Sequence, residues 1–252
     1  MPLVLMAGKP KTPTFQKIKL HDAFISEGAT IADINDDGEL DVVAGTLWWQ
    51  GPELKKSYSF SPVKNFNIKG PGLSGYSDNF LSFSLYLTND KWVDLLRVGL
   101  PGKPIRWFKN PGEAPFSANN HEGECESIHA VDNVCNESPQ LLDILDNAKP
   151  EFLCFSKNQI VVSVPSEEGA WPSYPISPKN KRFSKYTHGL GVGDINGDGL
   201  NDVLEKSGWW EQPVNWDKQS HWVYHKYIFS KRGGSQMYAF DVDGDGDNDV
   251  GF

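Results

Sequence analysis

The chain has 252 residues, of which 38% are hydrophobic and 23% charged, and its formal net charge is −9. This balance is typical of a folded globular protein with one large domain or two small ones. The acidic excess argues against a broad basic surface for nucleic acid or an anionic membrane, and no apolar run is long enough for membrane insertion.

The chain begins with residues 1–14, which we expect to be an extension outside the folded domain of residues 15–252. The apolar stretch of this segment is short and has no charged residues before it, so it does not resemble a secretory signal peptide. Farther along, nine tryptophans and frequent glycines and prolines favour many short strands over long helices.

An acidic motif of the form D-x-[DN]-x-D-G-x-x-D recurs along the chain. The complete copies are DINDDGELD, DINGDGLND and DVDGDGDND, which begin at residues 33, 194 and 241. Two weaker copies, YLTNDKWVD and DILDNAKPE, begin at residues 86 and 143, so consecutive copies lie 53, 57, 51 and 47 residues apart. A period of about 50 residues with several short strands per unit predicts the blades of a β-propeller.

Each repeat is predicted to contain an inner strand before the acidic motif, a second strand after it, a third strand and an outer strand. The predicted outer strands are residues 15–20, 61–68, 123–131, 182–187 and 222–229. The fold class is therefore all-β, with four complete blades and a partial fifth. Either the chain is a piece of a larger propeller, or it closes as five blades with residues 15–20 as the last outer strand and residues 3–6 as its third strand.

Aromatic pairs mark the predicted third strands. Trp48 lies 15 residues after the start of the first motif, and Trp209 lies 15 residues after the start of the fourth. Both begin a pair that runs on to a proline, in WWQGP and WWEQP, and WFKNP at Trp107 is a displaced third copy. Adjacent strand residues point to opposite faces, so we expect these pairs to pack between blades, with carbohydrate stacking as the alternative.

The three cysteines, Cys125, Cys135 and Cys154, are odd in number and lack the spacing of a metal site. We expect them to be free, buried thiols. One disulfide among them is the alternative, because spacing alone does not decide pairing.

The repeated acidic loops and the WW..P echo resemble the FG-GAP or VCBS repeats of integrin-α-like β-propellers. The resemblance covers roughly residues 15–252 and is strongest in the first, fourth and fifth repeats. It implies a propeller of about five to seven blades, with calcium bound between the first and second strands of a blade. It also implies a secreted or periplasmic, extracellular protein, although the chain shows no signal peptide. It implies no single activity, since one fold hosts many functions.

The acidic loops carry the chemistry of a calcium site. Calcium takes about six to eight oxygen ligands, and the loop supplies carboxylate or amide oxygens at positions 1, 3, 5 and 9. The absence of histidine and cysteine from these positions argues against zinc and copper. The predicted ligands are Asp33, Asn35, Asp37, Asp41, Asp194, Asn196, Asp198, Asp202, Asp241, Asp243, Asp245 and Asp249. The alternative is a turn that uses Asp and Gly for its backbone shape alone.

Residues 194–205 also satisfy the EF-hand pattern, but the flanking sequences are not helical, so we interpret this match as a coincidence. The two weaker loops are expected to lack calcium. Tyr86 and Lys91 replace the first aspartate and the glycine of one loop, and Leu145 and Ala148 break the other. Lys91 could itself supply positive charge to its loop.

Loops that lead into the inner strands would converge at one mouth of the central channel, where propeller ligands are expected to bind. The predicted ligand-binding residues there are Glu27, Asp78, Asn79, Glu137, His188 and Gln236. The predicted function is a calcium-stabilised binding or interaction module for a glycan or protein partner. One alternative is a sugar-active enzyme, a lyase or hydrolase in which Glu27, Glu137 and His188 act as acid and base. Another is a hydrated polar rim without a ligand, and enzymatic activity therefore stays open.

Overall fold

In the computed structural model, the described residues are 13–66, 75–88, 90–112, 125, 127–231, 234 and 236–252. Apart from one 3-10 helix, the regular structure in these ranges is β-strand, which confirms the predicted all-β fold. No helix in these ranges is both long and apolar enough to cross a membrane.

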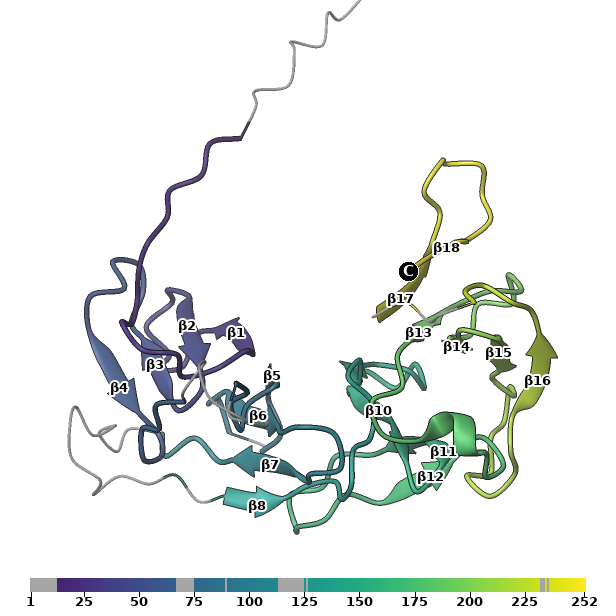
Figure 1. Ribbon diagram of the computed structural model, residues 1–252, viewed down its shortest axis with the longest axis horizontal. Helices are drawn as coiled ribbons and strands as arrows, with labels where there is room; N and C mark the ends of the chain where they lie inside the picture. The colour runs from purple at the N-terminus through teal and green to yellow at the C-terminus, as the bar shows by residue number, and fades with distance from the viewer. Residues whose placement is uncertain are drawn as a thin grey trace, which may run out of the picture.

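Three sheets of four antiparallel strands and one larger sheet make up the fold (Figure 1). The first blade comprises β1 (Ala29–Ala32), β2 (Asp41–Ala44), β3 (Leu47–Trp49) and β4 (Ser57–Ser59). The second comprises β5 (Leu81–Leu85), β6 (Asp94–Val98), β7 (Ile105–Phe108) and β8 (Ser127–His129). The third comprises β9 (Gln140–Leu142), β10 (Glu151–Ser156), β11 (Gln159–Ser163) and β12 (Ser173–Pro175). The fourth comprises β13 (Leu190–Gly193), β14 (Asp202–Glu205), β15 (Gly208–Glu211) and β16 (Val223–Lys226).

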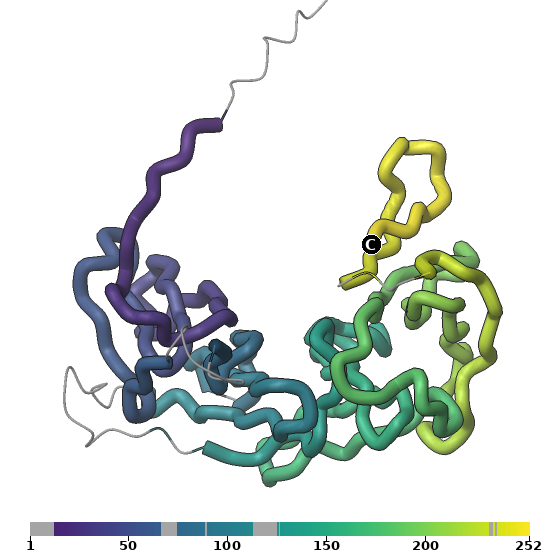
Figure 2. Tube along the Cα trace, in the orientation of Figure 1, coloured from purple at the N-terminus to yellow at the C-terminus, as the bar shows by residue number. Residues whose placement is uncertain are grey.

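The partial fifth blade is a hairpin of β17 (Gln236–Phe240) and β18 (Asp249–Gly251), and β17 pairs in parallel with β13. The blades follow one another along an open arc, with the first blade at one end and this hairpin at the other (Figures 1 and 2). Residues 15–20 form no strand, so the five-bladed closure that uses them as an outer strand is not present in the described ranges. Residues 3–6, its other segment, lie outside those ranges.

Two of the predicted outer strands are confirmed and three are wrong. β8 lies within residues 123–131 and β16 lies within residues 222–229. β4 precedes the segment 61–68, of which residues 61–66 are described and form no strand; β12 precedes residues 182–187, and residues 15–20 are not a strand. The position of these three segments in the repeat therefore did not locate the outer strands.

Pairing with the third strand decides where an outer strand lies. Tyr58 of β4 is opposite Trp48 of β3, and their rings stack with centroids 4.6 Å apart. The predicted strand 182–187 instead starts inside a 3-10 helix, η1 (Lys181–Phe183). Asn180 caps this helix, because its side chain accepts the N–H of Arg182 at 3.1 Å.

Buried apolar side chains form clusters between neighbouring blades. Trp48 shares a cluster with Leu95 of the second blade, Trp107 shares one with Phe152 of the third blade, and Trp210 lies in the cluster between the third and fourth blades. Burial of these large rings excludes a large apolar area from water, which stabilises the contacts between blades.

The aromatic pairs place their two rings on opposite faces of a blade, as predicted. Trp49 belongs to a separate cluster from Trp48 and packs with Ile25. Trp209 is only half-buried and stacks on His225, with ring centroids 4.1 Å apart. Packing between blades is therefore confirmed for Trp48 and Trp210, whereas Trp209 lies on the face of the fourth blade that is less covered.

Glycines in the inner strands allow neighbouring strands to approach closely. A Cβ atom on Gly191 would lie 2.3 Å from the carbonyl oxygen of Met237 on β17, far inside normal contact. Gly28, just before β1, lies equally close to β5, because a Cβ atom added to it would lie 2.6 Å from Leu81 Cα. The glycine-rich runs before the acidic motifs thus reflect contact between blades.

All three cysteines are free, buried thiols, which confirms the sequence prediction and leaves the alternative of a disulfide unsupported. Burial raises the pKa of the Cys125 thiol to about 12 and also raises the pKa of the Cys154 thiol. These side chains act as small apolar groups in the packing between blades.

Candidate functional site

The first aspartate of an acidic loop holds the backbone of its own turn. Asp33 accepts the N–H groups of Asp37 at 3.1 Å and Gly38 at 2.9 Å. The weaker loop of the third blade forms the same bonds, because Asp143 accepts two N–H groups at the equivalent positions, 2.9 and 2.8 Å away. The loops of the fourth and fifth repeats share this pattern. The shape of the turn therefore does not require the complete acidic set.

The sixth position of the loop has a left-handed backbone. Its φ is 88° at Gly38, 86° at Gly199 and 101° at Gly246. Ala148 occupies the same position of the third loop with φ 62°. A side chain makes this conformation costly, which is why glycine is the favoured residue there.

The ninth-position carboxylate joins its loop to the end of the third strand. Asp41 accepts the N–H of Ile34 at 2.8 Å on one oxygen and the N–H of Gly51 at 2.8 Å on the other. Gly51 is the residue before the proline in WWQGP. The acidic motif and the aromatic–proline motif, which recur together in the sequence, are therefore parts of one hydrogen-bonded unit.

The second and fourth blades repeat this bond. Asn110 donates its N–H to Asp94 at 2.7 Å, and Gln212 donates to Asp202 at 2.9 Å. Burial raises the pKa of Asp202 to about 6 against the opposing effect of its backbone donors, and it also raises the pKa of Asp94. The fully buried ninth position thus acts as a structural acceptor in each of these blades.

The fifth loop brings its acidic side chains closest together. Within the described residues, Asp241, Asp243 and Asp249 form the one set of three carboxylates with oxygens within 4.8 Å of one another. In the first loop, Asn35 Oδ1 is buried without a hydrogen-bond partner, while its amide nitrogen donates to Asp37 at 2.8 Å. A hard cation could use these oxygens, and calcium at the three complete loops stays a prediction.

Neighbouring acidic loops are tied to each other. Lys91 forms an ion pair with Asp36 of the first loop, so its charge bridges two blades. The side-chain amide of Asn248 donates to the carbonyl oxygen of Asp194 at 2.7 Å, which links the fifth loop to the fourth. Asn89 of the second loop lies outside the described residues.

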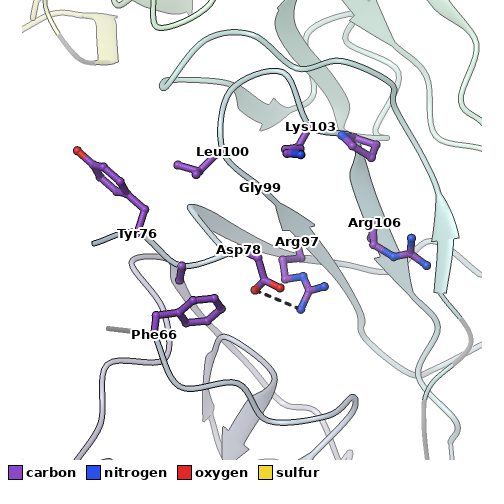
Figure 3. A pocket seen from close by; sticks show the side chains of 10 residues that line it. Phe66, Tyr76, Asp78, Arg97, Gly99, Leu100, Lys103 and Arg106 are labelled. Atoms are coloured by element: carbon purple, nitrogen blue, oxygen red, sulfur yellow. Dashed lines mark ion pairs between the residues drawn. The ribbon is translucent and has the colours of Figure 1, made fainter. Parts of the chain in front are cut away.

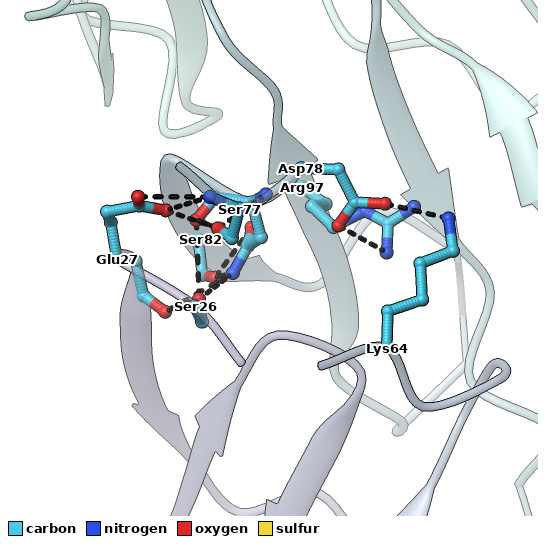
Figure 4. A network of polar contacts seen from close by, with 9 residues as sticks. Ser26, Glu27, Lys64, Ser77, Asp78, Ser82 and Arg97 are labelled. Carbon is cyan, nitrogen blue, oxygen red and sulfur yellow. Dashed lines mark hydrogen bonds and ion pairs between the residues drawn. The ribbon is translucent and has the colours of Figure 1, made fainter. Parts of the chain in front are cut away.

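At the opposite end of the inner strands, two of the predicted ligand-binding residues clamp the first blade to the second. Glu27 accepts the N–H of Ser77 at 3.0 Å and also its hydroxyl (Figure 4). Asn79 is fully buried and donates to Ser26 Oγ at 2.6 Å and to Ser82 Oγ at 2.9 Å. These contacts hold Asp78, which lies between Ser77 and Asn79.

The other predicted residues lie at different junctions. Glu137 and His188 contact each other across the third and fourth blades, with 2.6 Å between a carboxylate oxygen and Nε2. Gln236 accepts the hydroxyl of Tyr238 at 2.6 Å. The structure therefore brings Glu137 and His188 together, whereas Glu27 is engaged with Ser77 at the junction of the first two blades.

A pocket of about 320 Å³ lies beside Asp78, at the same end of the blades (Figure 3). Phe66 and Tyr76 stand on one side of it, and Lys103 and Arg106 stand on the other. Phe66 is attached to the first blade by its N–H, which donates to the carbonyl oxygen of Phe24 at 2.9 Å. The pocket is thus formed between the first and second blades.

The charged side chains of the pocket are close to one another. Asp78 pairs with Lys64 at 2.9 Å and with Arg97 at 3.9 Å (Figure 4). Arg97 is directly opposite Arg106 in the register of β6 and β7. Burial lowers the pKa of Arg97, Asp78 opposes this effect, and Arg106 adds to it.

Of the residues that line this pocket, the sequence predicted only Asp78. Arg97, Lys103 and Arg106 were missed because their approach depends on strand register. One signal was present: RVGLPGKPIR places Arg97 and Arg106 at either end of a segment rich in glycine and proline, which is typical of a turn between paired strands.

A comparison with models of known protein families finds no match, and neither does a comparison with curated proteins. Among solved structures, the chain is similar to an Agrocybe aegerita lectin described as specifically recognising non-reducing terminal N-acetylglucosamine. The two share 17% sequence identity with a TM-score of 0.46, and the match covers 90% of this chain. The chain spans 61% of the length of that lectin. The class of this protein, an all-β propeller of four-stranded blades, follows from its own sheet topology.

Proposed function

We propose that this protein is a binding module that recognises a saccharide in the pocket between its first and second blades. The observation that carries the proposal is the pairing of aromatic walls, Phe66 and Tyr76, with charged groups around about 320 Å³. This volume falls in the range of small-ligand sites. The apolar face of a sugar ring packs on an aromatic face, and its hydroxyl groups need fixed polar partners. The aromatic walls would therefore contact the ring, and the charged groups would bind its hydroxyl groups.

The clamp beneath the pocket supports binding because it fixes the polar groups before a ligand arrives. Glu27 and the buried amide of Asn79 hold the segment on which Asp78 lies. Asp78 is further held by Lys64 and Arg97. A site that is already ordered loses less conformational entropy on binding than a flexible one.

The role of the aromatic wall is tested with Tyr76→Ala, because Tyr76 is 49% exposed and its loss should not unfold the protein. The wild-type chain and this variant would be screened against an array of neutral and acidic glycans. We expect binding in the wild type and at least about a tenfold loss in the variant. The matched control is Tyr86→Ala, an exposed tyrosine beyond the other end of β5. Absence of glycan binding in the wild type would contradict the proposal.

We also propose that the first, fourth and fifth acidic loops bind calcium and that the protein has an extracellular role. Support for calcium comes from the oxygen-only donor set and from the convergence of Asp241, Asp243 and Asp249. Support for the setting comes from the weaker affinity of extracellular calcium modules, which suits high external calcium. Calcium would hold each loop shut and leave the pocket at the other end of the blade free.

A further inference from the structure

Building on the proposed saccharide site, we propose that the ligand carries an anionic group, a carboxylate or a sulfate, bound by Arg97, Lys103 and Arg106. The site would thus select acidic saccharides over neutral ones. The three cations line the same pocket as the aromatic walls, so one ligand can contact both.

The first argument is the cross-strand arginine pair. Arg97 and Arg106 are direct partners in the register of β6 and β7, so their side chains leave the same face of the sheet. Like charges directly opposite each other destabilise an antiparallel pair. An anion between the guanidinium groups would remove this repulsion, and arginine is suited to carboxylate or sulfate because it offers several donors in a planar fork.

The second argument is the partners that these arginines have in the protein. Arg106 contacts His129 Nε2 at 2.9 Å and the side chain of Ser127, and neither residue is an acid. Arg97 is 14% exposed, lies over the Phe108 ring at 5.0 Å, and approaches Asp78 only at 3.9 Å. The arginines are therefore held in place without close neutralisation.

The third argument is the charge balance of the pocket. Its lining includes Arg97, Lys103 and Arg106 but one acid, Asp78, which already pairs with Lys64. In the described part of the chain, Lys103 has no ion pair. This excess of positive charge is notable in a chain of net charge −9, because it gives the pocket the opposite sign to the whole molecule.

The apolar part of the lining favours a saccharide acid over a free inorganic anion. Phe66, Tyr76, Leu100 and Pro104 contribute apolar surface on the same pocket as the cations. An inorganic sulfate would leave that surface in contact with water, whereas a pyranose ring with a charged substituent would cover it. The combined apolar and cationic lining of the pocket therefore matches a sugar ring that carries an anionic substituent on one side.

The test is isothermal titration of the full chain with trigalacturonic acid, its methyl ester, a disaccharide of chondroitin 4-sulfate, and inorganic sulfate. The methyl ester keeps the sugar rings but removes the charge. We expect at least one acidic saccharide to bind about tenfold or more tightly than both the ester and inorganic sulfate, and added salt should weaken that binding. Tight binding of the galacturonate, the sulfated disaccharide or both would support the proposal, and the difference in affinity between them would show which anion the site prefers.

The variants are Arg106→Gln and Lys103→Gln, with Lys226→Gln on β16 as the control of equal charge change at an exposed site. Arg97 is left intact because it packs on Phe108. Arg106→Gln should weaken binding of the acidic ligand about 10- to 100-fold, Lys103→Gln should weaken it to a smaller degree, and the control should have no effect. Circular dichroism would check that each variant is folded.

Three outcomes would overturn the inference: neither acidic saccharide binding more tightly than the methyl ester, inorganic sulfate binding as tightly as the acidic saccharides, or unchanged affinity in both pocket variants. If neutral saccharides bind and Tyr76→Ala abolishes that binding, the saccharide site stands and only the anionic preference fails. If no saccharide binds, or if Tyr76→Ala leaves all binding unchanged, both proposals fail.

Discussion

Glu151 of the third blade offers the sharpest test of the ninth-position acceptor, because its loop is one of the two in which calcium is not expected. Its side chain is fully buried, and one oxygen accepts the N–H of Ile144 at 2.9 Å and that of Leu145 at 3.2 Å. The other oxygen accepts the side-chain amide of Asn147 at 2.7 Å. Glu151→Ala therefore leaves two backbone donors of the loop without their acceptor.

The expected cost follows from those two donors. A buried donor left unpaired costs about 1–3 kcal/mol, so Glu151→Ala should lower the free energy of unfolding by about 2–5 kcal/mol, toward the lower end because Leu145 is only half-buried. For a chain of this length the melting temperature should fall by roughly 5–15 °C. Glu151→Gln keeps one carbonyl oxygen and should cost about 1–2 kcal/mol, mainly through the lost bond to Asn147.

Thermal and urea unfolding with a calcium chelator present would measure these differences without a contribution from metal. Glu167→Ala, an exposed glutamate that follows β11 in the same blade, is the control and should change stability by less than about 0.5 kcal/mol. A Glu151→Ala variant as stable as this control would refute the view that the ninth acid holds the loop to its strand.

Two further predictions concern the acidic loops. Ala148→Gly should stabilise the protein by about 0.5 kcal/mol, because relief of about 1–2 kcal/mol of left-handed strain exceeds the added entropy of the unfolded chain, and a loss of stability in urea unfolding would contradict this. Asp198→Ala should reduce the calcium stoichiometry in isothermal titration by about one and lower stability in calcium by about 1–3 kcal/mol, whereas Asp90→Ala should change neither the stoichiometry nor the calcium dependence of melting. If both variants lost one calcium equally, the division into three calcium loops and two metal-free loops would be wrong.

The repeat structure could be predicted from the sequence because it is encoded locally and several times. The spacing of the acidic motifs predicted four complete blades and a partial fifth, and all appear in the sheets. The alternation of side chains along a strand was enough to place Trp48 and Trp49 on opposite faces. Outer strands were predicted less well, because their position depends on pairing such as that of Tyr58 with Trp48.

The candidate pocket could not be predicted in the same way. Asp78 was singled out from its place in the repeat, but Arg97 and Arg106 are nine residues apart and meet only when β6 and β7 pair. Phe66 and Tyr76 come from segments on either side of the boundary between two blades. A site built at such a boundary has no contiguous motif, so its members share no recognisable spacing.

By itself, the amino-acid sequence determined the blade period, the acidic turns and the residues that those turns require, because each turn is stabilised by hydrogen bonds within a few residues. Only the tertiary structure decided that the blades form an open arc in the described residues, that Glu27 serves as a clamp to Ser77, and that two arginines share one pocket. These features depend on contacts between segments far apart in the chain, and such contacts follow from packing and strand register, which a local pattern does not contain.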